Sequence, residues 1–360
     1  MITIGVIGAN SQVGTETCLF LSGMKDVRVV PICRGEASSV FLRRCGLDCR
    51  IGSLDSAERA SELLADCDVV ADFSLPRGAA SAIRPVIDKM VGLAIRHAPP
   101  HARYVYISTI MAFGMPQRGG GFRPRRVSRT IYGATKRHAE RLALRLGRKR
   151  GREVWALRLG QVHGELQEVS RQLVRGLLAR TVIVPRCPSC TVFVFSIAEA
   201  LVQIGAGRER PGTYTLVSSP EWTWAELLNH FVARAGVRVS VEESLAPTAP
   251  LSWISEAATR MKRAGIQTAS RAALGARETV AGYGLHYFPE FEHKLQAAYH
   301  RRRAEAEIDA DRLASSYRPF ADCFHGRMPG KRLLSLSDSR RTMAEPVEKV
   351  RSLIDRAGRL

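Results

Sequence analysis

Short apolar runs alternate with amphipathic stretches along the first half of the chain. The apolar runs are rich in β-branched residues and predict strands, whereas the stretches between them repeat apolar residues every three or four positions and predict helices. Such alternation favours a parallel sheet covered by helices on both faces. The expected strands lie at residues 2–7, 27–32, 49–51, 68–73, 104–109 and 154–159.

A glycine-containing turn, Gly8-Ala-Asn-Ser-Gln-Val-Gly14, joins the first expected strand to the first expected helix. Strand, tight turn and helix together place backbone N–H groups and a helix N-terminus against a pyrophosphate. Ser11 occupies the middle position of the G-x-x-G-x-x-G pattern, and because serine disfavours positive φ, this departure weakens the phosphate assignment without removing it. The residues expected to contact a dinucleotide here are Gly8, Asn10, Ser11, Gln12, Val13 and Gly14.

Arg34 follows the second expected strand, where a dinucleotide-binding domain presents the residue that reads the ribose. An acidic residue there would accept a hydrogen bond from the 2′-hydroxyl of NAD, whereas an arginine pairs with a 2′-phosphate. This position therefore favours NADP, with NAD still possible. The alternative is an ordinary exposed arginine in an arginine-rich chain.

Tyr132 and Lys136 stand four residues apart at the start of a long helical pattern, so they lie on one face of that helix. A nearby ammonium favours the phenolate and is expected to lower the pKa of the tyrosine, which suits proton exchange at a carbonyl or carbinol. Ser108 and Thr109 end the fifth strand at the edge where open α/β sheets bind ligands. One of these hydroxyls beside the Tyr-Lys helix could bond a substrate oxygen, and a simple capping role is the alternative.

These features predict a doubly wound parallel sheet with a smaller C-terminal lobe. After residue 165, strand-like runs at 192–196 and 212–217 precede helical stretches, and further helices are expected at 288–313 and 346–357. The expected organisation is an NAD(P)-binding Rossmann domain at 1–165, a substrate lobe at 166–330 interleaved with it near 190–205, and a helical tail at 331–360.

The composition is that of a globular protein with a strongly basic surface. The 360 residues carry a net charge of +20, and the start of the chain shows neither a signal peptide nor a membrane-spanning run, so we expect a cytoplasmic protein without membrane contact. The charge suits a small polyanionic ligand or a nucleic acid. Because no helix-turn-helix, zinc-finger or RRM signature is present, nucleic acid is the less favoured partner.

The eight cysteines are expected to be small buried side chains rather than disulfides or metal ligands. Cys187 and Cys190 form the one CxxC motif, but a zinc site would need two further ligands at suitable spacing. The sequence therefore predicts no metal.

Taken together, the motifs resemble the extended short-chain dehydrogenase/reductases, the group that contains sugar-nucleotide epimerases, dehydratases and ketoreductases. The resemblance covers residues 1–240 and rests on GANSQVG, YVYIST, YGATK and LRLGQVHG in the same order. It implies that Tyr132 is the catalytic acid/base, that Lys136 holds the nicotinamide ribose, and that Thr109, with Ser108 beside it, polarises the substrate. It also implies cofactor contacts from Ser53, Leu54 and Phe73, and a substrate contact from Gln161.

The same resemblance implies a nucleotide sugar as substrate. Arg171 and Arg175 lie four residues apart on one predicted helix, and with the basic loop 123–126 they could hold the diphosphate. Two solvated arginines are the alternative. Thr109 is followed by Ile110 rather than by the acidic pair of 4,6-dehydratases, so dehydration is disfavoured and reduction or epimerisation is expected.

Two other classes of function stay open at this stage. One is a catalytically idle NADP-binding sensor or regulatory protein, and the other is a basic nucleic-acid-associated protein of the same fold.

The family often dimerises through the helix of the Tyr-Lys pair, but arginines at 137, 141, 145 and 148 line the outer face of this helix. Stacking that face on a second copy would bring like charges together, so the oligomeric state is left open.

Overall fold

The computed structural model describes residues 1–76, 80–113, 131–176, 181–186, 188–236, 238–244 and 336–359. All of them belong to one compact unit, in which the C-terminal segment joins the part of the chain before residue 246. Several expected features lie outside the described residues: the loop 123–126, the helix at 288–313, Cys187 and Cys323.

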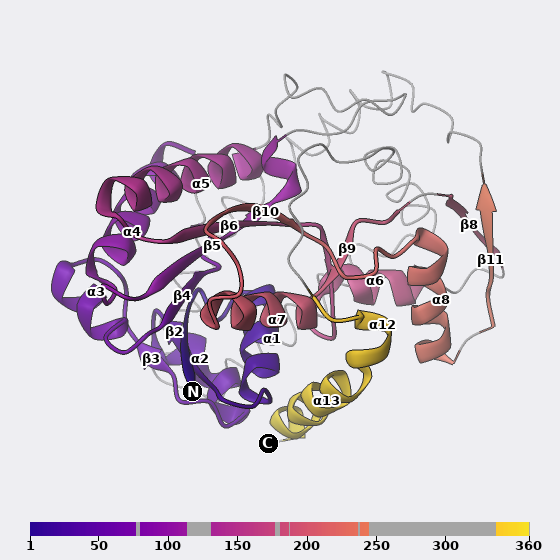
Figure 1. Ribbon diagram of the computed structural model, residues 1–360. Coiled ribbons are helices and arrows are strands. Elements are labelled where there is room, and N and C mark those ends of the chain that lie inside the picture. Colours follow the sequence, from indigo (N-terminus) through magenta and orange to yellow (C-terminus); the bar gives the residue numbers. More distant parts are fainter. Residues whose placement is uncertain are drawn as a thin grey trace. The chain divides into compact units, whose positions relative to one another are not determined.

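A seven-stranded parallel sheet forms the centre of this unit (Figure 1). Its strand order is β10-β6-β5-β4-β1-β2-β3, so the order reverses between β1 and β4, as in a doubly wound fold. The predicted fold class is confirmed. The strands are β1 (Ile2–Ile7), β2 (Val27–Cys33), β3 (Arg50–Ile51), β4 (Val69–Asp72), β5 (Arg103–Thr109), β6 (Val154–Leu159) and β10 (Gly212–Leu216).

Helices cover both faces of the sheet (Figure 1). On one face α3, α4 and α5 pack side by side, and on the other α1 packs against α7, with α13 outside it. The helix α4 runs without a break through Pro85. The helices named so far are α1 (Gln12–Ser22), α3 (Ala57–Leu63), α4 (Ala80–His97), α5 (Ile131–Arg150), α7 (Val194–Gly205) and α13 (Ala344–Arg359), and α2 (Glu36–Arg44) follows β2.

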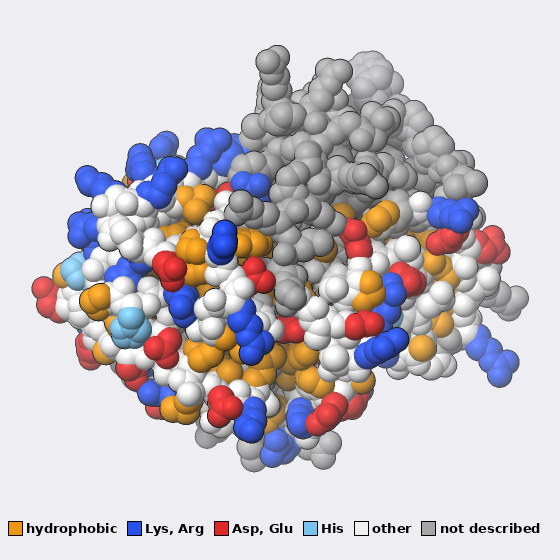
Figure 2. Space-filling model, viewed as in Figure 1, with side chains coloured by type: hydrophobic (Ala, Val, Ile, Leu, Met, Phe, Trp, Pro, Cys, Tyr) orange, Lys and Arg blue, Asp and Glu red, His pale blue; other side chains and the backbone are white. Residues whose placement is uncertain are grey.

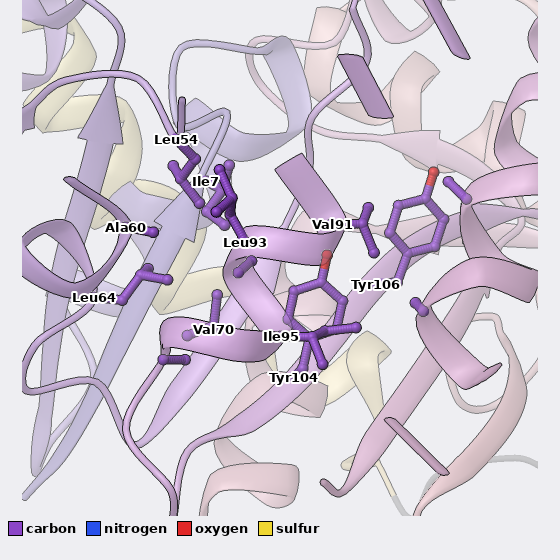
Figure 3. Packing of buried hydrophobic residues seen from close by; sticks show 14 of the residues in the cluster. Ile7, Leu54, Ala60, Leu64, Val70, Val91, Leu93, Ile95, Tyr104 and Tyr106 are labelled. Atoms are coloured by element: carbon purple, nitrogen blue, oxygen red, sulfur yellow. The ribbon is translucent and has the colours of Figure 1, made fainter. Parts of the chain in front are cut away.

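The core between the sheet and α4 is built from large side chains of β4 and β5 (Figure 3). Val70, Tyr104 and Tyr106 are at most 2% exposed and pack with Val91 and Ile95. Burying a side chain of this size contributes about 1.5–3 kcal/mol each to the hydrophobic free energy. This packing fixes the carboxyl ends of β4 and β5, where the candidate site lies.

The segments after β6 form smaller elements beside the main sheet. The strand β10 joins the edge of the main sheet, next to β6. Two further helices, α6 and α8, contact each other. The short helix η1 (Ile110–Phe113) follows β5. The bounds of the elements after β6 are β7 (Gln161–His163), α6 (Glu168–Gly176), β8 (Thr181–Pro185), β9 (Thr191–Phe193), α8 (Trp224–Ala235), β11 (Ser240–Ser244) and α12 (Ser339–Thr342), with β7 pairing with β9 and β8 with β11.

The surface of this unit is rich in basic side chains along α5 (Figure 2). Arg141, Arg145 and Arg148 are all exposed there. Among the described helices, none is both long and apolar enough to cross a bilayer.

Candidate active site

The turn between β1 and α1 needs glycine at both of its ends. Gly8 has φ of +73°, and a Cβ on it would lie 3.0 Å from the backbone nitrogen of Ser74. A Cβ on Gly14 would lie 2.6 Å from the carbonyl oxygen of Gly8. The turn therefore keeps the backbone of β1, the start of α1 and the segment after β4 in close contact.

Ser11 fits this turn without strain. It has φ of −75° and ψ of 156°, so the positive φ that serine disfavours is not required, and its Oγ accepts a hydrogen bond from the N–H of Gly14 at 3.1 Å. The serine is the N-cap of α1, a position serine favours. The expected weakening of the phosphate site does not apply.

The turn accordingly fits the pyrophosphate of a dinucleotide. No acidic residue stands in the first turn of α1, so the positive end of the helix dipole faces no competing carboxylate. Backbone groups of Asn10, Gln12 and Val13 lie at this turn. These residues, with Ser11 between them, would hold the pyrophosphate.

The other predicted cofactor contacts follow the carboxyl ends of neighbouring strands. Arg34 is exposed directly after β2, and Ser53 is half-buried after β3. Leu54 and Phe73 are buried, each 6% exposed, and Phe73 follows β4. All four thus lie at the sheet edge that carries the glycine turn, where open α/β sheets bind ligands.

Tyr132 and Thr109 are brought together by α5 and β5. Their side chains form a hydrogen bond, and Tyr132 is 43% exposed. Burial raises the pKa of Tyr132, and the hydrogen bond with Thr109 partly opposes that rise. A lowering of the tyrosine pKa by Lys136 is not seen in this structure, because desolvation of the phenolate outweighs the hydrogen bond with Thr109.

Lys136 lies one helical turn after Tyr132 and is buried, at 5% exposure. Its Nζ donates hydrogen bonds to the carbonyl oxygens of Ile107, at 2.9 Å, and Ser74, at 3.4 Å, and sits 5.1 Å from the ring centroid of Tyr106. Burial lowers the pKa of Lys136 to about 8, while the charge of Asp72 acts in the opposite direction. The ammonium is thus held at the carboxyl ends of β4 and β5.

Ser108 does not join Thr109 and Tyr132. Its Oγ donates to Oε2 of Glu140 at 2.7 Å, and Glu140, 1% exposed, also binds Arg158 of β6 at 2.7 Å. Removing one partner of a buried ion pair is strongly destabilising. Ser108 therefore supports the buried Glu140, which pairs with the partly buried Arg158 between β5, β6 and α5, and its predicted contact with substrate stays a prediction.

Gln161 starts β7, just beyond the end of β6, whose Leu159 lies opposite Thr109 in the sheet. Both polar atoms of its side-chain amide are buried and have no hydrogen-bond partner among the described residues. Buried polar atoms are normally bonded, so an unpaired amide at this edge suits a ligand contact. Arg171 is exposed on α6, and Arg175 follows on the same helix with a side chain outside the described residues.

Sequence reasoning missed two buried carboxylates near the site. Asp72 ends β4 and is 1% exposed. Glu16 of α1, fully buried, accepts hydrogen bonds from the backbone N–H groups of Glu165 and Leu166, at 2.7 and 3.0 Å, and burial raises its pKa to about 7. At Asp72 a charged residue at the end of an apolar run was the available signal, whereas Glu16 lies between two threonines.

A parallel doubly wound sheet with a glycine turn at its first crossover, and a tyrosine and a lysine at the same edge, defines an NAD(P)-binding α/β protein. The model of the NAD dependent epimerase/dehydratase family matches residues 4–184, half of the chain. The chain belongs to this family, and the extended short-chain dehydrogenase/reductase resemblance is confirmed. The comparison with curated proteins finds no match.

Solved structures with the same fold include sugar-nucleotide enzymes. UDP-N-acetylglucosamine 4-epimerase from Bacillus cereus is 16% identical, with 68% of this chain and 89% of that chain covered and a TM-score of 0.51. UDP-glucuronic acid 4-epimerase from Bacillus cereus in complex with NAD is 15% identical, with 68% and 87% covered and a TM-score of 0.50. The dTDP-glucose 4,6-dehydratase from Bacillus anthracis in complex with NAD is 14% identical, with 68% and 84% covered and a TM-score of 0.51.

Among the described residues, no group of His, Cys, Asp and Glu side chains is arranged to hold a metal ion. Cys18, Cys33, Cys49 and Cys67 are buried free thiols, and Cys45 is a partly exposed one.

Proposed function

We propose that this protein is an NAD(P)-dependent oxidoreductase or epimerase that acts on a nucleotide sugar or a related hydroxy or keto substrate. The observation that carries the proposal is the hydrogen bond between Tyr132 and Thr109, one helical turn from the buried Lys136 and at the edge that carries the glycine turn. The bound nicotinamide would supply or accept the hydride. Tyr132 would move the hydroxyl proton, Thr109 would orient the reacting oxygen, and Lys136 would hold the nicotinamide ribose.

The protonation states suit a proton donor at neutral pH. Because the pKa of Tyr132 is raised, its phenol keeps its proton, while Lys136, with a pKa of about 8, is mostly charged. A neutral phenol beside a cation can donate its proton to an oxygen that gains negative charge as hydride arrives. For the reverse direction the ammonium would stabilise the phenolate.

For the cofactor we propose NADP over NAD, because Arg34 is exposed after β2 and no acidic side chain occupies that position. For the substrate we propose a nucleoside-diphosphate sugar. Its support is the unpaired buried amide of Gln161 and the exposed Arg171 on α6, which would meet polar and phosphate groups. Dehydration is disfavoured because Thr109 leads into the apolar helix η1 rather than an acidic pair.

The first test is Tyr132→Phe, which removes only the phenol oxygen. We expect nearly unchanged NADPH binding and a turnover lower by about 10² or more, the usual contribution of general acid–base catalysis. Tyr214→Phe is the matched control, since Tyr214 lies on the edge strand β10 and its hydroxyl donates to the carbonyl oxygen of Arg210. Full activity in Tyr132→Phe would refute the assignment, and a parent that binds NADPH without any turnover would indicate a sensor.

A second test concerns the substrate class. UDP or dTDP at millimolar concentration should raise the thermal unfolding temperature, because a ligand that binds only the folded state stabilises it. Replacing Arg171 and Arg175 by alanine should raise KM for a sugar nucleotide by roughly one to two orders of magnitude, since a charge-assisted contact contributes about 1.5–3 kcal/mol. Exposed Arg208, which follows the C-terminal end of α7, gives a control variant, Arg208→Ala. A parent that neither UDP nor dTDP stabilises would rule out the sugar-nucleotide assignment.

A further inference from the structure

A buried aspartate closes the carboxyl end of β4 beside the candidate site. Oδ2 of Asp72 accepts a hydrogen bond from the Tyr104 hydroxyl at 2.5 Å, and Oδ1 accepts one from the N–H of Ser74 at 2.8 Å. A buried charge is costly unless it is bonded or paired, so a residue of this kind is retained only where other groups support it. The neighbouring strand positions on β4 are all apolar.

The peptide group of Ser74 links Asp72 to Lys136. The N–H of Ser74 donates to Asp72, and the carbonyl oxygen of Ser74 accepts from Nζ of Lys136 at 3.4 Å. The same residue packs against the glycine turn, because a Cβ on Gly8 would lie 3.0 Å from its nitrogen. One side chain thus orients a backbone segment that touches both the lysine and the cofactor turn.

Charge adds to this geometry. The titratable groups of the elements packed around the Lys136 ammonium are Asp72 on β4, Tyr106 on β5, and Tyr132 and Glu140 on α5. Both tyrosines have raised pKa values and are neutral at pH 7, and Glu140 is bound by Arg158. Asp72 is the charge that raises the pKa of Lys136 against the effect of burial.

We propose that Asp72 is a positioning residue for Lys136. Through the Ser74 peptide, Asp72 holds the Lys136 ammonium in place, and its charge favours the protonated form. Its catalytic consequence rests on the proposed function, because it assumes that Lys136 holds the nicotinamide ribose. The coupling itself belongs to the protein without cofactor. It can therefore be measured independently of any activity.

The test is a pH titration of the Lys136 side chain by NMR in the full cofactor-free chain, labelled with 13C at lysine Cε. The chain has only eight lysines, and the Lys136 signal is assigned by its absence in Lys136→Met. Asp72→Asn keeps the shape and an acceptor for Ser74 but removes the charge. We expect its Lys136 midpoint to fall below that of the parent by about one pH unit or more, as for loss of a nearby opposite charge.

Asp68→Asn is the matched control, because Asp68 precedes the same strand at its opposite end and is partly exposed. It should leave the Lys136 midpoint unchanged. If Asp72→Asn does not fold, Asp72→Ser removes the same charge with a smaller side chain, and the same fall is expected. An unchanged midpoint in either folded Asp72 variant overturns the proposal.

NADPH binding measured against pH connects the coupling to the cofactor. In the parent we expect affinity to decrease as pH rises through about 8, where Lys136 loses its charge, and in Asp72→Asn at correspondingly lower pH. A binding curve that does not move, although the NMR midpoint does, overturns the link to the cofactor. A parent that binds neither NADPH nor NADH overturns the proposed function instead, while the NMR result still decides the coupling between Asp72 and Lys136.

Discussion

Arg34 is the residue through which cofactor choice can be changed by one substitution. It is exposed at the end of β2, next in the sheet to β1, which carries the glycine turn. Its neighbour Gly35 is the N-cap of α2, so the arginine projects where the strand ends and the helix begins. A long charged side chain there can reach a 2′-phosphate without disturbing the fold.

Arg34→Asp should move the preference from NADP towards NAD. The substitution replaces a charge-assisted contact by repulsion, and losing such a contact changes the ratio of the two dissociation constants by roughly ten- to a hundred-fold. Fluorescence titration with NADPH and NADH measures both constants. Arg44→Asp, at the far end of α2, is the control. An unchanged ratio in Arg34→Asp would make Arg34 an ordinary surface arginine.

At this scale the sequence predicts the residues of local motifs and misses those defined by distant contacts. The spacing of Tyr132 and Lys136 predicts their shared helix face, and the ends of strands predict where Thr109 lies. The bonds of Asp72 depend on Tyr104 from the next strand, and those of Ser108 on Glu140, 32 residues away. No local pattern records such pairings, so which hydroxyl faces Tyr132 could not be predicted.

Elements were predicted best where apolar runs are continuous. Strands β1 to β6 lie within one residue of their expected bounds, because parallel strands buried on both faces give unbroken apolar runs. The place of β10 beside β6 could not be predicted, since strand order depends on packing between segments far apart in the chain. The predicted domain boundaries at 165 and 330 stay predictions.

The contact between β7, β9 and α8 buries two neutral imidazoles. His163 is fully buried, and the ring of His230 packs against Phe193 at 5.6 Å and Trp222 at 5.4 Å. Burial lowers the pKa of His163 to about 3 and that of His230 to about 4. In each ring Nε2 is buried without a hydrogen-bond partner among the described residues.

These pKa values predict acid sensitivity of the fold. The folded state binds fewer protons than the unfolded state between about pH 4 and 6.5, so stability from His230 is present above pH 6.5 and is lost as pH falls to 4. Between pH 6.5 and 4, the free energy of unfolding should therefore fall by about 2–3 kcal/mol less in His230→Phe than in the parent. Urea unfolding at several pH values measures it. Glu16 has a raised pKa and contributes to the pH dependence of stability with the opposite sign. Because the parent and His230→Phe both contain Glu16, its contribution cancels when the two are compared.

The same substitution at His101, which is exposed beside Asp68, is the control and should leave the pH dependence nearly unchanged. The phenylalanine also tests packing, because the ring must fit among Phe193, Trp222 and Phe231. An equal loss of stability in the parent and in His230→Phe would mean that His230 stays solvated enough to charge in the folded state.

At the scale of the whole molecule, α5 carries seven of the 54 basic residues and only one acidic residue, Glu140. Arg141, Arg145 and Arg148 of α5 are exposed, and basic side chains gather on the surface over this helix (Figure 2). Burial lowers the pKa of Arg137 on the same face, and the neighbouring charge of Arg141 acts in the same direction. A two-fold axis along this face would double the charge facing across the interface.

We therefore expect a monomer, or a dimer through another surface, at moderate salt. Salt screens charges over about 8 Å at physiological ionic strength, so association through α5 would become stronger as salt is added. Association through an apolar surface would change little between about 0.05 and 0.5 M salt. Light scattering across this range, on the parent, Arg141→Glu and the control Arg208→Glu, measures the state of assembly.

Arg141→Glu removes repulsion at the centre of the stripe, so in a protein that does not pair through α5 it should leave the mass unchanged at every salt concentration. A stable dimer at low salt that Arg141→Glu dissociates, and Arg208→Glu does not, would show that the arginines bind acidic groups of a second copy and would contradict the prediction.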